Sequence, residues 1–212
     1  MDEEIEEVMR EIDEQLLEGV ARWDSAPMLA GIAKAHFKLF TACNKNAEKL
    51  RGSPDHTQEN CPVCHQMDEL SSEALQHGIV TITFSAFALE AHINEYGSRR
   101  LSATYFERFI DKLDTISKWM VIPRLVCGKE ISRDSQPFQY LVELFRLRNK
   151  IVHPKAKDVD LTELAGDKEP FGIREHNLLF EFVPDAIRAL ESLADEARRL
   201  DPSDPLFGRF LR

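Results

Sequence analysis

The chain has 212 residues, of which 43% are hydrophobic and 30% charged, and its formal net charge is −10. This length can bury a substantial core, and the acidic balance argues against non-specific binding along nucleic acid, because phosphates would be repelled at long range. The acidic N-terminus lacks the positive region of a secretory signal, no apolar run is long enough to cross a bilayer, and 4 cysteines are too few for a disulfide scaffold. These features predict a soluble cytoplasmic protein with no membrane partner.

The first part of the sequence predicts helices interrupted by one long loop. Apolar residues recur at three- and four-residue steps between Ile5 and Val20, and a second helix is predicted over residues 28–50. The stretch RGSPDHTQENCPVCHQ is polar and contains glycine and proline, so residues 52–70 are expected to form a loop. Residues 79–93 are apolar nearly all round, which favours a buried central helix.

Prolines mark the helix boundaries that the sequence predicts further along. A helix is expected over residues 103–121, with Pro123 ending it. Another is expected to begin near Pro137, because proline suits the first turn of a helix. It should end at His153, because Pro154 disfavours a helical backbone in the residue before it.

The last part of the sequence predicts an irregular segment followed by a helix. Residues 154–183 are expected to be irregular, with HNLLFEFV as a short strand or extended piece, and Pro184 is expected to open a final helix. The tail after it either docks or hangs free. The expected organisation is an all-α, single compact domain with the divisions 1–51 (N-terminal helices), 52–70 (loop), 71–200 (helical core) and 201–212 (tail).

One arginine is predicted to lie on the apolar side of its helix. At about 100° per residue, the apolar face of the helix ending at His153 consists of Phe138, Leu141, Val142, Leu144, Phe145, Ile151 and Val152. Arg148 falls inside this face, where an unpaired charge is costly. On the central helix, Thr83, Glu90 and Asn94 form a thin polar line. We therefore expect Glu90 and Arg148 to meet across two packed helices.

Two stretches of the sequence resemble HEPN domains. RNKIVH, residues 148–153, matches the R-x4-H pattern of that family, including the polar residue after the arginine, and SAFALEAHINEYG resembles its glutamate-bearing helix. The resemblance covers residues 71–200. It implies a HEPN-like helical bundle that is usually dimeric. Many family members are metal-independent ribonucleases, often toxins or defence effectors that a protein antitoxin or regulator would control.

The resemblance also implies roles for individual residues. Arg148 would bind the phosphate of single-stranded RNA, His153 would transfer a proton or orient the 2′-hydroxyl, Asn149 would orient the site, and Glu90 would hold the arginine. No cofactor is required. In a homodimer, the two histidines would share the acid and base roles. The predicted RNA-binding residues are Arg146, Lys150, Lys155, Lys157 and Asn94.

Two other functions stay open on the sequence alone. The first is a HEPN module without catalysis that binds a protein partner or a nucleotide, since the Glu90–Arg148 pair can also be purely structural. The second is an unrelated helical interaction protein whose acidic first helix docks a basic partner.

The CPVCH stretch has the spacing of a covalent haem attachment motif, but no export signal accompanies it. Zinc is the better metal alternative, with Cys61, Cys64 and either His56 or His65 as ligands, although a second cysteine pair is missing. The simplest interpretation is a loop carrying two reduced thiols. His36, His77 and His176 are expected to be isolated surface or core residues.

Overall fold

The computed structural model describes residues 24–51, 61–153 and 171–209, and every regular element within these ranges is a helix. The predicted all-α class is therefore confirmed. The helix expected between Ile5 and Val20 lies outside the described residues. Within the ranges described, no helix has the length and apolar character that a membrane span requires.

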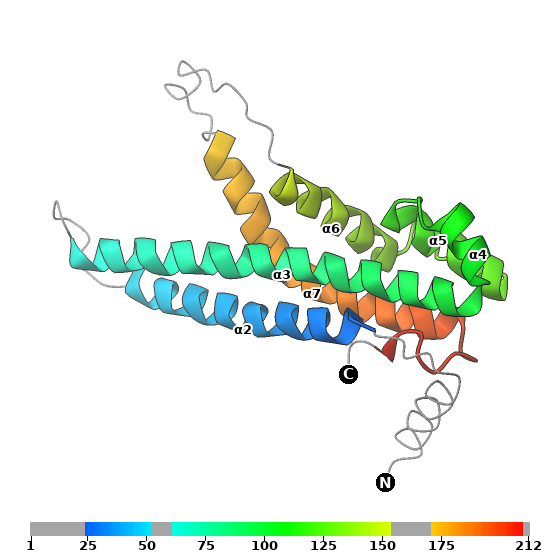
Figure 1. Cartoon of the computed structure of the whole chain (residues 1–212). Coiled ribbons are helices and arrows are strands. Elements are labelled where there is room, and N and C mark those ends of the chain that lie inside the picture. The colour runs from blue at the N-terminus through cyan, green and yellow to red at the C-terminus, as the bar shows by residue number, and fades with distance from the viewer. Residues whose placement is uncertain (1–23, 52–60, 154–170, 210–212) are drawn as a thin grey trace, which may run out of the picture.

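Helices α2 (Ala26–Arg51) and α3 (Pro62–Arg100), the latter the longest helix in the described ranges, form an antiparallel pair and lie side by side in Figure 1. His36 of α2 meets His77 of α3, with their Nδ1 atoms 3.0 Å apart, and Cys43 donates to the Glu73 carboxylate at 3.7 Å. The later residue of α2 thus contacts the earlier residue of α3, which means that the two helices run in opposite directions. The expectation that His36 and His77 are isolated was wrong, because the helix pairing joins residues that are distant in sequence.

The prediction of a loop over residues 52–70 was wrong for the second half of that range, which is helical. Residues 62–70 belong to α3, with Cys61 at the N-cap and Pro62 in the first turn. Proline suits this position because the first N–H groups of a helix have no intrahelical acceptor. Residues 52–60 lie outside the described residues.

The single helix predicted over residues 103–121 is instead broken. The Asp114 carboxylate accepts hydrogen bonds from the Ser117 hydroxyl at 2.6 Å and from the Ser117 backbone N–H at 3.0 Å, which together cap a new helix and lower the pKa of Asp114. Pro123 lies inside that helix, which ends at Gly128 in a left-handed conformation with φ 72°. The elements of this segment are α4 (Ala103–Tyr105), the π-helical η1 (Phe106–Ile110) and α5 (Thr115–Cys127).

The motif-bearing helix α6 (Gln136–Val152) begins and ends as the sequence predicts. The Ser135 hydroxyl accepts from the Phe138 backbone N–H at 3.4 Å, and Pro137 lies in the first turn. His153 is the residue that caps its C-terminal end.

The last helix, α7 (Phe171–Leu200), is longer than predicted. HNLLFEFV is helical rather than a strand, and Pro184 lies inside the helix instead of opening it. Gly78 of α3 packs closely against Val183, and the Tyr96 hydroxyl donates to Asp201 at 2.8 Å. Both pairs are 105 residues apart, so α7 and the tail run parallel to α3.

The core lies around α3, which α2, α5, α6 and α7 all contact (Figure 1). The Trp119 indole N–H on α5 donates to the Leu89 backbone carbonyl at 3.2 Å and so fixes α5 against α3. The largest fully buried side chains include Ile82, Leu89, Ile93, Tyr96, Trp119, Ile122, Leu141, Leu144, Leu190 and Phe207.

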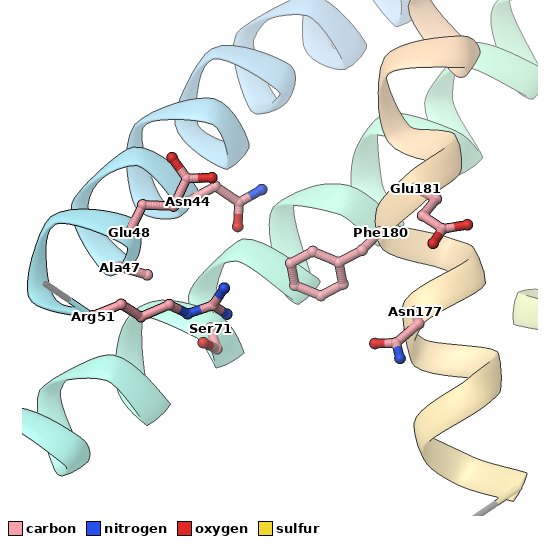
Figure 2. A pocket seen from close by; sticks show the side chains of 8 residues that line it. All are labelled: Asn44, Ala47, Glu48, Arg51, Ser71, Asn177, Phe180 and Glu181. Atoms are coloured by element: carbon pink, nitrogen blue, oxygen red, sulfur yellow. The ribbon is translucent and has the colours of Figure 1, made fainter. Parts of the chain in front are cut away.

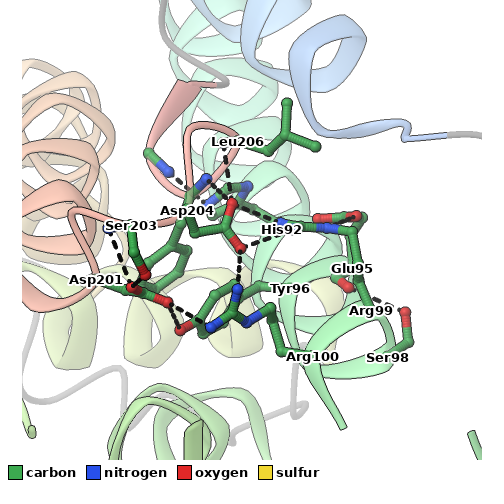
Figure 3. A network of polar contacts seen from close by, with 12 residues as sticks. His92, Glu95, Tyr96, Ser98, Arg99, Arg100, Asp201, Ser203, Asp204 and Leu206 are labelled. Carbon is green, nitrogen blue, oxygen red and sulfur yellow. Dashed lines mark hydrogen bonds and ion pairs between the residues drawn. The ribbon is translucent and has the colours of Figure 1, made fainter. Parts of the chain in front are cut away.

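The described part of the tail docks onto α3 through a buried polar cluster (Figure 3). Arg99 donates to both carboxylate oxygens of Asp204, at 2.7 and 3.0 Å, and the Gly208 backbone N–H donates to His92 Nε2 at 3.1 Å. The Phe207 ring stacks on Tyr96 with centroids 3.7 Å apart. Burial, and then the charge of Arg99, lower the pKa of His92 to about 3, so its ring is neutral and Nε2 can accept this hydrogen bond.

Candidate functional site

Glu90 and Arg148 meet across α3 and α6, as their positions on the two predicted helices suggested. Arg148 Nη2 donates to Glu90 Oε2 at 2.9 Å. The Arg148 side chain is 18% exposed and that of Glu90 35% exposed, so the pair lies at the edge of the core. A charge in this position needs a partner, and the carboxylate of Glu90 provides it.

Three further side chains hold the Arg148 guanidinium. Its Nη1 donates to Asn149 Oδ1 at 3.0 Å, and its Cζ lies 5.3 Å from the centre of the Phe87 ring and 5.6 Å from that of Phe145. Arg148 Nε is buried and has no hydrogen-bond acceptor among the described residues. Both Nη atoms carry a second N–H that these two hydrogen bonds leave unused. The guanidinium is therefore fixed in place but still has donors to offer.

His153 is exposed at the C-terminal end of α6. Its backbone N–H donates to the Asn149 carbonyl at 2.9 Å, which completes the last turn, while φ −123° and ψ 62° take the chain out of the helix. Asn149 is also exposed, and the two residues are four apart, so they share one flank. The helix thus presents an amide, an imidazole and the edge of a guanidinium at one end.

The positive charge around this motif is smaller than the sequence suggests. Arg146 Nε donates to Glu143 Oε2 at 2.7 Å on the same helix, and this contact offsets its charge. Lys150 is exposed. Lys155 and Lys157 lie outside the described residues.

Asn94 lies in a setting that does not favour phosphate. It lines a cavity of about 490 Å³ together with Asp24, Glu95 and Glu107. Burial raises the pKa of Glu95, which is also paired with Arg99. The Asn94 side-chain oxygen is buried without a hydrogen-bond partner among the described residues. Contact of Asn94 with RNA stays a prediction, and the neighbouring carboxylates weigh against it.

A small apolar groove lies beside the motif, between α6 and α7. It measures about 90 Å³ and is lined by Leu147, Lys150, Ile151, Leu178 and Leu179. Leu178 is 38% exposed. Val152 was expected on the buried face of α6, but it is 43% exposed because it occupies the last helical position. Apolar surface therefore adjoins the arginine–histidine motif.

A polar cavity, which the sequence did not indicate, opens between α2, α3 and α7 (Figure 2). Its volume is about 320 Å³, and its lining residues are Asn44, Ala47, Glu48, Arg51, Ser71, Asn177, Phe180 and Glu181. Carboxylate and amide groups of α2 and α7, the Arg51 guanidinium of α2 and the Ser71 hydroxyl of α3 line it together with the Phe180 ring. Only the helix packing brings them together, so spacing along the chain gave no signal for this cavity.

The proposed zinc ligands do not assemble within the described part of the chain. Cys61 and Cys64 are neighbours at the start of α3, but no group of three or more His, Cys, Asp or Glu residues in the described ranges could hold a metal ion. His56 lies outside those ranges. A zinc site would therefore need ligands from elsewhere.

Comparisons with protein-family models, with curated proteins and with solved structures found no match.

Proposed function

We propose that this protein is a metal-independent endoribonuclease of the HEPN type, which cleaves single-stranded RNA at a site shared by two copies of the chain. The observation that carries the proposal is the position of Arg148. Glu90 and Asn149 fix its guanidinium on the helix whose end carries the exposed His153. RNA cleavage without a metal requires a cation for the phosphate and groups that move protons, and these residue types supply both.

The chemistry assigns each residue a step. The unused N–H groups of Arg148 bind the phosphate oxygens and stabilise the extra negative charge at phosphorus. One His153 takes the proton of the 2′-hydroxyl as that oxygen attacks phosphorus. A second histidine gives a proton to the departing 5′-oxygen. The products are a 2′,3′-cyclic phosphate and a free 5′-hydroxyl.

The second histidine must come from a second copy of the chain. A two-fold axis near the end of α6 would bring the two His153 residues together, because a two-fold interface pairs the same surface of both copies. The exposed Val152 and Leu178, together with the apolar groove beside them, are suited to such a contact. If the protein is a toxin or defence effector, a protein antitoxin or regulator that covers this surface would inhibit it.

A second candidate is a HEPN-type module that binds a partner or a nucleotide without catalysis. The observation that favours it is the low exposure of Arg148, whose two hydrogen bonds within the chain already give it a structural role. The two candidates differ in a measurable product.

The test uses a single-stranded RNA of defined sequence incubated with the full-length protein in EDTA. Ribonuclease activity predicts fragments ending in a 2′,3′-cyclic phosphate, and no cleavage at a position where the 2′-hydroxyl is replaced by hydrogen. Arg148→Lys keeps the charge beside Glu90 but loses the planar fork of donors. The variant should therefore still fold, but it should cleave RNA much more slowly than wild type. Intact RNA, or cleavage at the 2′-deoxy position, would contradict the proposed chemistry.

A further inference from the structure

The first turn of α3 holds two cysteines next to each other. Cys61 is the N-cap residue, Pro62 follows it, and Cys64 lies in the first turn. The His65 backbone N–H donates to the Cys61 carbonyl at 3.2 Å, which closes this turn. Proline fixes the backbone φ angle between the two cysteines, so their relative position is built into the helix start.

The two thiols are in direct contact. The side chains of Cys61 and Cys64 are hydrogen bonded, and this hydrogen bond, followed by burial, raises the pKa of the Cys64 thiol. Cys61 is only 4% exposed, whereas Cys64 is half-buried. Cys43 and Cys127 have other partners, the Glu73 carboxylate and the Pro123 carbonyl respectively. Thus the CPVC stretch brings two thiols together within the first turn of one helix.

We propose that Cys61 and Cys64 form a redox-active dithiol, which closes to an intramolecular disulfide by exchange with a low-molecular-weight disulfide such as oxidised glutathione. The proposal is independent of the ribonuclease chemistry. Cys61 and Cys64 lie at the N-terminal end of α3, whereas Glu90 lies nearer its C-terminal end.

The exchange proceeds in two balanced steps. Cys64, the more exposed of the two, loses its proton, and its thiolate attacks one sulfur of glutathione disulfide. The glutathione disulfide bond breaks, a protein–glutathione disulfide forms, and one glutathione thiolate leaves. Cys61 then loses its proton and attacks Cys64, which forms the Cys61–Cys64 disulfide and releases the second glutathione. The protein loses two electrons and two protons, and the glutathione disulfide is reduced to two thiols.

Two features of the helix start affect this reaction in opposite directions. The positive end of the helix dipole stabilises a thiolate in the first turn. The hydrogen bond and the burial that raise the pKa of Cys64 oppose this effect and keep its proton in place at neutral pH.

The experiment treats the full-length reduced protein with oxidised glutathione and measures intact mass and disulfide position by mass spectrometry. The wild-type protein should lose the mass of two hydrogen atoms, with Cys61 and Cys64 linked and Cys43 and Cys127 still alkylatable. Cys61→Ser should instead retain one glutathione on Cys64, because no second thiol displaces it. The Cys43→Ser/Cys127→Ser double variant should behave like wild type.

Two results would overturn the proposal. One is a wild-type protein that accumulates glutathione on Cys64 to the same extent as Cys61→Ser. The other is a protein that, after a chelator has removed any bound metal, keeps both Cys61 and Cys64 alkylatable in the presence of oxidised glutathione.

Discussion

Arg148 of α6 and Glu90 of α3 are joined by a hydrogen-bonded ion pair of 2.9 Å between residues that are 58 positions apart in the sequence. Replacing Glu90 with leucine should lower the free energy of unfolding by about 1–3 kcal/mol, because it leaves the Arg148 charge at the edge of the core without its partner. Urea denaturation followed by circular dichroism measures this loss.

A double-mutant cycle separates this pair from its surroundings. Glu90→Leu combined with Arg148→Met should cost less than the sum of the two single changes, with a coupling of about 0.5–3 kcal/mol. Arg146→Ala is the control, because its exposed pair with Glu143 is worth about 0.5 kcal/mol or less. Strictly additive losses would mean that the two side chains do not interact in solution.

His92 predicts a pH dependence of stability. Its pKa in the folded protein is about 3, well below the ordinary value of about 6.5, so the unfolded chain binds the proton first. The contribution of His92 to the free energy of unfolding is fully present above about pH 6.5. It falls as the pH drops towards 3, by up to about 1.4 kcal/mol per pH unit.

His92→Gln is the matched variant for this effect, because an amide oxygen can still accept from the Gly208 N–H but does not titrate in this range. The dependence of unfolding free energy on pH should be shallower in His92→Gln than in wild type. Equal slopes between pH 6.5 and 4 would show that His92 does not stay neutral in the folded protein.

The docking of the tail can be tested at Gly208. This residue has φ 88°, and a Cβ atom there would lie 2.4 Å from the Ala194 carbonyl oxygen. Gly208→Ala should therefore destabilise the protein through both backbone strain and overpacking, about 2–5 kcal/mol together. Gly128→Ala has a similar φ of 72° but open space around it, so it should cost only about 1–2 kcal/mol. Similar melting temperatures for the two variants would contradict the docked tail.

The local chemistry of α6 explains why its site could be predicted from the sequence. Ser135 and Pro137 mark its start, and a regular 3.6-residue period then determines that Arg148 faces the core side. Glu90 was the evident carboxylate on an apolar helix. The ion pair therefore followed from helical geometry and the cost of burying a charge.

Other features depend on tertiary packing, which the sequence pattern does not reveal. Pro123 is buried inside α5, and Pro184 lies within α7 between the buried residues Val183 and Ala186. Packing against α3 offsets the cost of a proline in each helix, so the usual rule that proline ends a helix failed. The Arg99–Asp204 contact joins residues 105 positions apart and has no local signal.

If two copies pair through the apolar surface beside α6, a charge placed on that surface should weaken the dimer. Val152→Lys places a charge on the exposed end of α6, where a second copy would be expected to cover it, and should weaken self-association at least tenfold. Met28→Lys is the control, because Met28 is also exposed, at 53%, but lies on α2. Analytical ultracentrifugation measures both. A monomeric wild-type protein, or an unchanged dimer of Val152→Lys, would contradict an interface at this surface.

The most direct test of the account is the rate of RNA cleavage in EDTA by wild type, His153→Ala and His65→Ala. All three should fold, since both histidines are exposed. Wild type and His65→Ala should cleave at the same rate, while His153→Ala should be slower by a factor of about 100 or more. Cleavage by His153→Ala at the wild-type rate would contradict the assignment of proton transfer to this residue.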